Sequence, residues 1–334
     1  MSNRRASHVT FGFDFQVNAA IVLMLENIKD MKSLRLEGNY EDIELLMDDG
    51  QYILAQAKSV VNASSDFRNV RSNIKKSLRT LSEGSYNKSI KQLIFITNSP
   101  NPFNDQESMS AFYGNAKRDY NTLPPSAKAL VDEYLQNIDT PLDTNKLRVQ
   151  ILPFETDNND EKYKVVKQAI DDFIGQLNIN IYGIGKRLLQ VWHNDIFINS
   201  TNANADISLT KKSIMWPIIV IATDIAQYDD DFMNEFDESL YDEIVHAYKD
   251  LIDSCCERYD FFAKVLKDYT MFEYAGNNSQ KCVNFAKTKW TDYLSEFDID
   301  GIDNDTKEGL AKIVLYSIVR RRITIDNIRK GVNL

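Results

Sequence analysis

The sequence has few residues that could form disulfide bonds or bind zinc. Three cysteines and three histidines occur among 334 residues, and their spacing matches no Cys/His zinc motif. So sparse and odd a cysteine count argues against a disulfide framework and for a reducing compartment. Hydrophobic residues make up 43% of the chain, and a chain of this length can bury a large core without such cross-links. We therefore expect a globular fold held together by its apolar core.

An apolar segment long enough for a membrane span is also missing from the sequence. Residues 1–9 are polar and contain no apolar stretch of the signal-peptide type. The longest apolar runs, 19–25 and 214–222, are too short to cross a bilayer. We therefore expect a cytoplasmic protein that does not associate with a membrane.

Positive charge is in the minority, because 39 basic residues face 49 acidic ones and the formal net charge is −10. A uniformly acidic surface would repel nucleic acid, so DNA binding would need a local basic surface. Residues 58–91 could provide it, with eight basic residues against two acidic ones. A helix expected over 66–81 places four of the basic residues in one stripe suited to phosphate contact: Arg68, Arg71, Lys75 and Arg79. An ordinary solvated helix face is the alternative interpretation of this stripe.

Two domains of different class are expected from the hydrophobic pattern. Up to about residue 180 helical and strand periods alternate, with helices at 13–28, 66–81, 126–137 and 161–177 and strands at 34–37, 42–47, 51–58, 91–97 and 147–153. This order predicts an α/β domain over 1–180, with a mixed sheet flanked by helices. Only helical patterns follow, at 186–198, 211–228, 241–256, 261–269, 280–297 and 306–319. They predict an all-α domain over 181–334, which we expect to serve oligomerisation or partner docking.

The two strands at 42–47 and 51–58 form a hairpin whose register decides whether its polar residues meet. A two-residue loop would place Asp42 and Lys58 on opposite faces, whereas a three-residue loop, 48–50, sets Asp42 opposite Gln56. Only the longer loop leaves one face consistently apolar, and Gly50 supplies the positive φ that such a loop needs. Side chains two residues apart in a strand share a face. The sequence therefore predicts a cluster of Asp42, Gln56 and Lys58.

Such a cluster has the chemistry of a metal-dependent phosphodiesterase. A carboxylate can bind a hard divalent cation such as Mg²⁺ through oxygen, and the cation can polarise a phosphodiester and activate water. A nearby ammonium group can stabilise the charge that develops at phosphorus. Glu37, a short loop before Asp42, could supply another carboxylate, and Gln16 on the first helix could reach the same site. Glu44 shares the face of Asp42. The alternative is an ordinary polar hairpin face, but Gln56 and Lys58 lie in an otherwise apolar strand.

A family resemblance is carried by four short segments: Gly12-Phe-Asp-Phe-Gln16, Leu36-Glu37, Glu41-Asp42-Ile-Glu44 and Gln56-Ala-Lys58. Together they resemble the dsDNA endonuclease domain of CD-NTase-associated effectors in bacterial anti-phage defence. That family belongs to the Mrr-like branch of the PD-(D/E)XK superfamily, whose third motif is Q-x-K. The resemblance covers residues 10–175, with sharp motifs only in 10–60, and implies a restriction-endonuclease-like α/β fold for this domain.

The resemblance also implies roles for these residues. Asp42 would be the metal ligand, Gln56 the polar ligand of the second motif and Lys58 the catalytic lysine, with Glu37 and Gln16 as further catalytic residues. The cofactor would be Mg²⁺ or Mn²⁺ and the substrate double-stranded DNA. Gln56 stands where the superfamily usually has a glutamate, so a charged ligand is missing unless Glu37 or Glu44 compensates. Asp42, Gln56 and Glu44 are the expected metal ligands.

The layout of the whole chain resembles the nuclease subunit of Lamassu-type defence systems. That resemblance implies an effector held by an SMC-like ATPase and a small accessory subunit, and we expect the chain itself to form a homo-oligomer. Two alternatives remain. One is a nuclease-fold module that binds DNA or partner proteins without cutting, which Gln56 and the acidic net charge would favour. The other is a structural subunit that does not contact DNA.

Overall fold

Two units of different composition make up the chain. The computed structural model describes residues 6–154, 159–179, 181, 183–222, 232, 236, 238–297 and 302–334. Unit 1 contains Met1–Pro217 and Gly331–Leu334, and unit 2 contains Ile218–Lys330. Unit 1 is an α/β structure and unit 2 is helical, so the two structural classes predicted from the sequence are confirmed.

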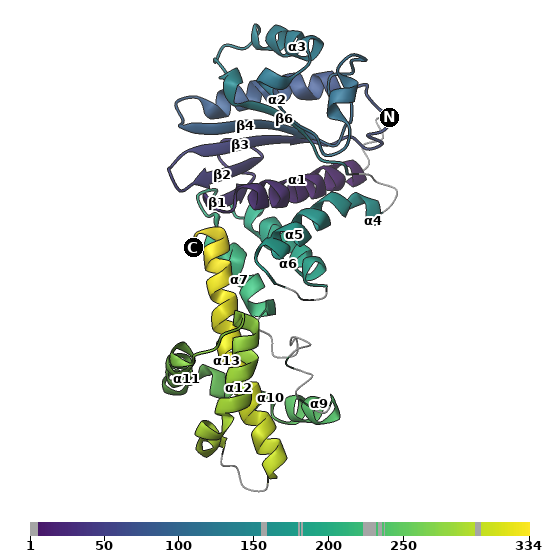
Figure 1. Cartoon of the computed structure of the whole chain (residues 1–334). Coiled ribbons are helices and arrows are strands. Elements are labelled where there is room, and N and C mark those ends of the chain that lie inside the picture. Colours follow the sequence, from purple (N-terminus) through teal and green to yellow (C-terminus); the bar gives the residue numbers. More distant parts are fainter. Residues whose placement is uncertain are drawn as a thin grey trace. The chain divides into compact units, whose positions relative to one another are not determined.

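Unit 1 is built on a mixed sheet of seven strands (Figure 1). The strands are β1 (Met31–Leu36), β2 (Ile43–Met47), β3 (Tyr52–Lys58), β4 (Ile90–Thr97), β5 (Lys117–Asp119), β6 (Leu147–Ile151) and β7 (Leu209–Thr210). Their order across the sheet is β5-β6-β4-β3-β2-β1-β7. β3 pairs in parallel with β4, and β4 with β6, whereas the other neighbouring strands are antiparallel.

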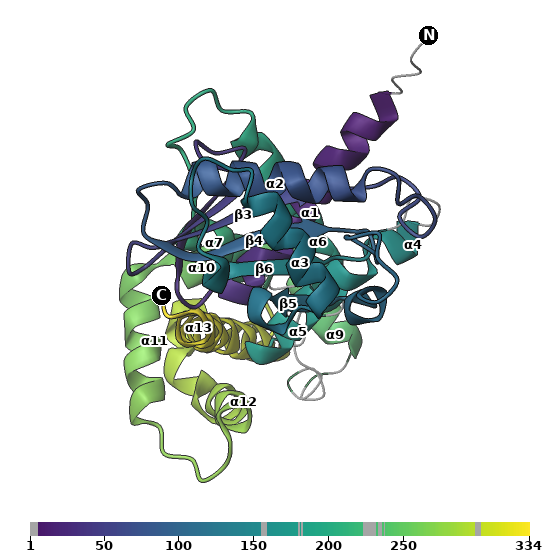
Figure 2. The ribbon, with the colours of Figure 1, turned by 90° about the horizontal axis from the view of Figure 1, so that it is seen from above.

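Helices cover both faces of this sheet. One face carries α2 (Val70–Ser85) and α3 (Pro125–Leu135), which lie on the near side of the strands in Figure 2. The other face carries α1 (Ala6–Asn27), α5 (Lys164–Gln176) and α6 (Ile184–Ser200), seen below the sheet in Figure 1. The short helix α4 (Asn159–Lys162) precedes α5, and 3-10 turns occur at η1 (Met109–Phe112), η2 (Tyr120–Thr122) and η3 (Thr144–Lys146).

α1 is a long and apolar helix of unit 1. Residues 8–27 are long and apolar enough to cross a membrane by length and composition alone, which the sequence analysis did not anticipate. Most of these side chains are buried against the sheet, including Phe15, Ile21 and Leu23 at 0% exposure. Burial in the core of unit 1 therefore accounts for the hydropathy of this helix.

The β2–β3 hairpin has the register predicted from the sequence. Ile43 pairs with Ala55 and Leu45 with Ile53. Met47 N–H donates to the carbonyl oxygen of Gln51 at 2.8 Å, which closes a three-residue loop. Gly50 ends that loop with φ of +80°, a conformation that costs little only for glycine. The three-residue loop is therefore confirmed.

α2 begins later than predicted. It spans Val70–Ser85 rather than 66–81, because Asp66 forms a local turn instead of a first helical turn. The carboxylate of Asp66 accepts hydrogen bonds from the backbone N–H and the guanidinium of Arg68, and such side-chain bonds compete with helix formation. The apolar face of the helix is nevertheless buried, since Val70, Ile74, Leu78 and Leu81 all face the core.

Unit 1 extends well past the boundary placed at residue 180. α6 packs against α1, α5 and β1, and β7 pairs with β1 at the edge of the sheet. Arg35 of β1 also donates hydrogen bonds to the carbonyl oxygens of Asn199, Asn202 and Ile207. The expectation of purely helical structure after residue 180 was therefore wrong in this segment, where the two-residue strand β7 is too short to leave a periodic signal.

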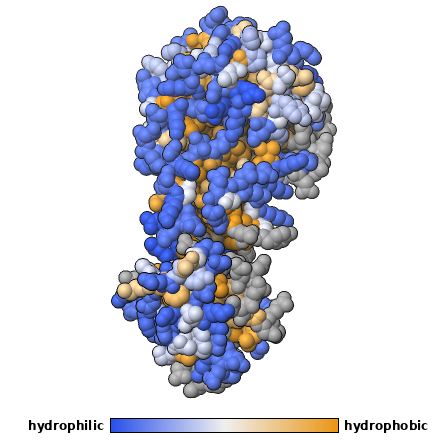
Figure 3. All heavy atoms as spheres, in the orientation of Figure 1, coloured by the Kyte–Doolittle hydropathy of each residue, from blue (hydrophilic) through white to orange (hydrophobic). Residues whose placement is uncertain are grey.

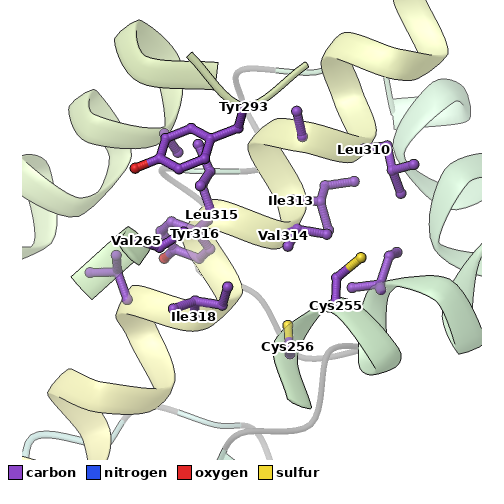
Figure 4. Close-up of a cluster of buried hydrophobic side chains, with 14 of the residues drawn as sticks. Cys255, Cys256, Val265, Tyr293, Leu310, Ile313, Val314, Leu315, Tyr316 and Ile318 are labelled. Atoms are coloured by element: carbon purple, nitrogen blue, oxygen red, sulfur yellow. The ribbon is translucent and has the colours of Figure 1, made fainter. Parts of the chain in front are cut away.

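Unit 2 is a set of helices around an aromatic and aliphatic core (Figure 4). The helices are α9 (Glu238–Ala247), α10 (Lys249–Glu257), α11 (Tyr259–Met271), α12 (Asn278–Lys289), the 3-10 segment η4 (Trp290–Phe297) and α13 (Asn304–Val332). Figure 4 shows side chains of α13, among them Leu310 and Ile313, gathered with Cys255 and Tyr293. Of the helix predicted over 211–228, α7 (Lys211–Ala222) is described, and residues 223–228 lie outside the described part.

Candidate active site

The three predicted residues of the hairpin converge on a single carboxylate oxygen. Asp42 lies directly before β2 and opposite Gln56 of β3. Its Oδ2 accepts hydrogen bonds from Gln56 Nε2, from the backbone N–H of Ala57 at 3.1 Å and from Lys58 Nζ at 3.3 Å. Gln56 is 4% exposed, whereas a third of the Lys58 side chain, 34%, is exposed. The cluster is therefore closed on the β3 side and open to solvent at the lysine.

α2 supplies a residue to this cluster that the sequence analysis did not select. Thr80 Oγ1 donates a hydrogen bond to Gln56 Oε1 at 2.6 Å. An amide has one accepting and one donating end, so this bond directs the amide nitrogen of Gln56 toward Asp42. Only the packing of α2 on β3 brings Thr80 to the site, and the local sequence around it carries no motif that could have identified it.

Glu37 and Gln16 lie at the margin of the cluster. Glu37 follows β1 with φ of +51°, and its N–H donates to the carbonyl oxygen of Asp42 at 2.8 Å. Desolvation and the Asp42 carboxylate raise the pKa of Glu37, whereas Gln16 and Lys58 act to lower it. The pKa of Glu37 therefore depends on Asp42, Gln16 and Lys58, although Glu37 is exposed as a residue.

Glu44 stabilises the β1–β2 turn, which precedes Asp42. Its Oε1 accepts hydrogen bonds from the backbone N–H groups of Tyr40 and Glu41. The carboxyl group also fills the space beside Gly38, where a Cβ atom would come within 2.2 Å of the Glu44 side chain. Glu44 is thus held in the β1–β2 turn and does not join the Asp42 cluster.

Glu41 is a second acidic residue at the site that the sequence analysis left out of its candidates. It is 7% exposed, and its Oε1 is buried without a hydrogen-bond partner in the described structure. Burial and the neighbouring Asp42 carboxylate raise the pKa of Glu41 to about 8, while Thr80 and Lys58 act in the opposite direction. Strict strand alternation would have directed Glu41 away from Asp42, and the turn before β2 removes that alternation.

The predicted basic stripe makes contacts within unit 1. Arg68 pairs with Asp66 at 2.7 Å, and Arg79 with Glu83 at 2.8 Å. Arg71 donates hydrogen bonds to the carbonyl oxygens of Phe103 and Asn104, and Lys75 lies 5.9 Å from the ring centre of Tyr134 on α3. The two acidic residues of the basic segment therefore neutralise two of the four cations. The contacts described for the other two go to α3 and to residues 103–104, not to Asp42.

A different flank of α2 borders the cluster. Residues three and four apart lie on one face of a helix, so Asn73 and Lys76 line up with Thr80, which contacts Gln56. Lys76 is exposed and has no ion-pair partner among the residues that the structure describes. This cation is the nearest one on α2 to the hairpin site by helical position.

A cavity of unit 1 lies away from the hairpin site. It has a volume of about 500 Å³ and lies between α1, β5 and α5, lined by residues such as Val22, Leu25, Lys117 and Phe173. Figure 3 shows apolar side chains over this part of unit 1. The lining residues do not include Asp42, Gln56 or Lys58. The hairpin site is therefore separate from this cavity.

The donor set at Asp42 fits a divalent cation. Two carboxyl groups, Asp42 and Glu41, offer oxygen atoms, which hard cations prefer, and the amide of Gln56 would add a third once its oxygen turned from Thr80 toward Asp42. The unpartnered Glu41 Oε1 is a buried acceptor that a cation would satisfy. No group of three or more His, Cys, Asp or Glu side chains arranged for a metal occurs among the described residues, so a cation at Asp42 would need a donor of another kind, such as the amide of Gln56.

Comparisons with known proteins do not assign the chain to a family. Neither protein-family models, nor curated proteins, nor solved structures gave a match. The functional interpretation therefore depends on the geometry of the site and on its motifs.

Proposed function

We propose that this chain is a metal-dependent endonuclease of double-stranded DNA with a restriction-endonuclease-like N-terminal domain. The observation that carries the proposal is the convergence of Gln56, Ala57 and Lys58 on Oδ2 of Asp42. The D…Q-x-K residues that resemble the PD-(D/E)XK motifs thus lie within contact distance. The mixed sheet flanked by helices supports the same class of fold.

The residues of the site have complementary tasks in phosphodiester hydrolysis. Asp42 and Gln56 would hold Mg²⁺ or Mn²⁺ through oxygen, which requires the Gln56 amide to turn its oxygen away from Thr80. The bound cation would supply Lewis-acid polarisation of the phosphate. The Lys58 ammonium orients the attacking water and stabilises negative charge at phosphorus. Water then forms a new P–O bond and loses a proton to solvent, while one ester P–O bond breaks and the leaving oxygen takes up a proton from solvent.

DNA would approach along the flank of α2 that borders the site. Lys76 and Lys58 would contact phosphates there, and the stripe of Arg68, Arg71, Lys75 and Arg79 would add weaker contacts because its charges are partly neutralised. Such contacts bind the backbone without reading the sequence.

The biological setting follows from the resemblance of the chain layout to Lamassu-type systems. The chain would act in the bacterial cytoplasm as the effector subunit of an anti-phage complex, as a homo-oligomer. Its helical unit 2 would dock an SMC-like ATPase and a small accessory subunit. These partners would hold the nuclease inactive until a phage signal arrives.

Cleavage of supercoiled plasmid tests the proposal. The assembled protein is expected to nick plasmid with Mg²⁺ and to lose at least about a hundredfold in rate in Lys58→Ala, because the charge on the reacting phosphate is no longer balanced. Lys91→Ala, an exposed lysine of β4, is the matched control. If the fully assembled wild type shows no metal-dependent cutting, or if Lys58→Ala cuts as fast, the proposal fails.

A second candidate is a nuclease-fold module that binds DNA or partner proteins without cutting. It is favoured by the orientation of Gln56, whose amide nitrogen rather than its oxygen faces Asp42. Calorimetry separates the two functions, since a cutting enzyme takes up Mg²⁺ or Mn²⁺ at Asp42 and a binding module does not.

A further inference from the structure

The hairpin motif by itself supplies only one negative charge to a bound cation. Gln56 is neutral, and Asp42 is the only carboxylate among the three converging residues. Divalent cations held through oxygen depend strongly on the number of carboxylate ligands. Three glutamates close in sequence could provide the second charge: Glu37, Glu41 and Glu44.

Glu44 and Glu37 are poorly placed for this task. The Oε1 atom of Glu44 already accepts two backbone hydrogen bonds in the β1–β2 turn. Turning that carboxylate toward Asp42 would leave the N–H groups of Tyr40 and Glu41 without their acceptor, which costs free energy in a buried turn. Glu37 is exposed as a residue, and its carboxyl group already has Gln16 as a hydrogen-bond partner, so a cation gains less there.

Glu41 has the properties that the other two lack. It is more than nine-tenths buried, and its Oε1 has no hydrogen-bond partner in the described structure. Glu41 directly precedes Asp42 in the chain, and its side chain lies beside Gly84 of α2, the helix that carries Thr80. The Thr80 hydroxyl also interacts with its carboxyl group. Thr80 in turn donates to Gln56, so one hydroxyl of α2 lies next to both Glu41 and the amide.

We propose that Glu41 is the second carboxylate of the cation site and replaces the charge that is missing at Gln56. The inference rests on the proposed function, because it assigns a ligand to the same site. A cation at this position would also bind Glu41 Oε1, which has no hydrogen-bond partner in the described structure. A buried polar atom without a hydrogen bond is rare in folded proteins, and a cation held between Asp42 and Glu41 satisfies it and separates two like charges.

Calorimetric titration of the full-length protein with Mn²⁺ tests the assignment without any activity measurement. Glu41→Gln preserves the shape of the side chain and removes its charge, so we expect Mn²⁺ affinity to fall by about tenfold or more. Asp49→Asn is the matched control, because it removes an exposed acidic charge from the loop of the same hairpin. Its affinity should stay within about twofold of wild type, since exposed charges at this distance are screened.

A double variant that moves the carboxylate from position 41 to position 56 tests the assignment in a second way. In the double variant Glu41→Gln with Gln56→Glu the number of carboxylates at the site returns to two. We expect Mn²⁺ affinity to recover to within about threefold of wild type, as charge number rather than position dominates. Thermal melts of each metal-free variant show whether a loss of affinity reflects unfolding.

The possible results separate this inference from the proposed function. If Asp42→Asn abolishes Mn²⁺ binding and Glu41→Gln binds like wild type, the role of Glu41 is wrong and the metal site stands. A larger loss in Glu37→Gln than in Glu41→Gln would assign the charge to Glu37 and overturn the inference. If wild-type protein takes up no Mn²⁺, both the inference and the proposed metal-dependent function fail.

Discussion

At the scale of single residues, Oδ2 of Asp42 determines the geometry of the site. Three donors converge on it from β3, so a change at Asp42 affects the amide, the lysine and the strand backbone together. Thr80 fixes the amide from the opposite side. The backbone N–H of Ala57 is part of this arrangement, and it links the position of the carboxylate to the register of the hairpin.

Charge reversal on α2 distinguishes its two flanks. Lys76→Glu should weaken binding of a short DNA duplex by about tenfold at low salt, because this cation is exposed and borders the site. Arg79→Glu should weaken it only about twofold, because Arg79 is already paired with Glu83. Fluorescence anisotropy with a labelled duplex measures both affinities. An equal or larger loss in Arg79→Glu would place the DNA on the α3 side of the helix instead.

At the scale of elements, a polar cluster joins three helices beneath the sheet. Asp14 of α1 accepts hydrogen bonds from Lys162 Nζ and from Tyr163 Oη at 3.0 Å, and its Oδ1 lies 3.0 Å from His193 Nε2 of α6. Lys162 also lies 4.9 Å from the ring centre of Phe154. Burial raises the pKa of Asp14, but the hydrogen bonds from His193 and Lys162 outweigh it, so this pKa is lower than usual.

Asp14→Asn is expected to lower the free energy of unfolding at pH 7 by about 1–3 kcal/mol, because it leaves a largely buried lysine without its counter-charge. A carboxyl group whose pKa is lowered on folding stabilises the protein above its unfolded pKa and loses that effect as pH falls through the folded value. The difference between wild type and Asp14→Asn should therefore shrink below about pH 4. Urea unfolding at pH 7 and at pH 3 measures both values.

The control for Asp14 is the exposed pair of Glu161 and Lys164. Glu161→Gln should leave the unfolding transition unchanged, since exposed pairs contribute little. A destabilisation by Glu161→Gln equal to that of Asp14→Asn would show that the Asp14 cluster has no special role.

The hairpin site could be predicted from sequence because local rules determine it. The loop ending in Gly50 and the apolar alternation of β3 fix the register, and the register brings Asp42 to Gln56. Glu41 and Thr80 could not be predicted in this way. Their positions depend on the turn before β2 and on the packing of α2, which are tertiary features without a local signal. The pairing of Arg79 with Glu83 follows i,i+4 spacing and could have been recognised.

At the scale of the whole molecule, the end of the chain returns to unit 1. α13 begins in unit 2 and ends in the segment Gly331–Leu334, which belongs to unit 1. There the carbonyl oxygens of Val332 and Lys29 accept hydrogen bonds from Lys211 Nζ at 3.1 and 2.8 Å. Lys211 also lies 3.3 Å from the carboxylate of Asp48, in the loop of the hairpin. Sequence patterns could not predict this return, because hydrophobic periodicity identifies helices but not the unit in which each of them ends.

Lys211→Met tests the importance of this connection. It leaves the carbonyl oxygens of Lys29 and Val332 without their donor, so the free energy of unfolding should fall by about 1–3 kcal/mol. The neighbouring Lys212→Met changes an exposed side chain and should have no measurable effect. Thermal unfolding followed by circular dichroism compares the two variants, and equal stability of both would contradict the role given to the C-terminal segment.

The central claim is that Asp42 is the centre of a DNA-cutting site, and a nicking assay on Asp42→Asn tests it most directly. The assay follows conversion of supercoiled plasmid by the assembled protein with Mg²⁺ or Mn²⁺, with Asp49→Asn as the control on the same hairpin. The account predicts metal-dependent nicking by wild type and Asp49→Asn, and a loss of at least about a thousandfold in Asp42→Asn. Equal nicking by Asp42→Asn, or none by wild type with either metal, would contradict it.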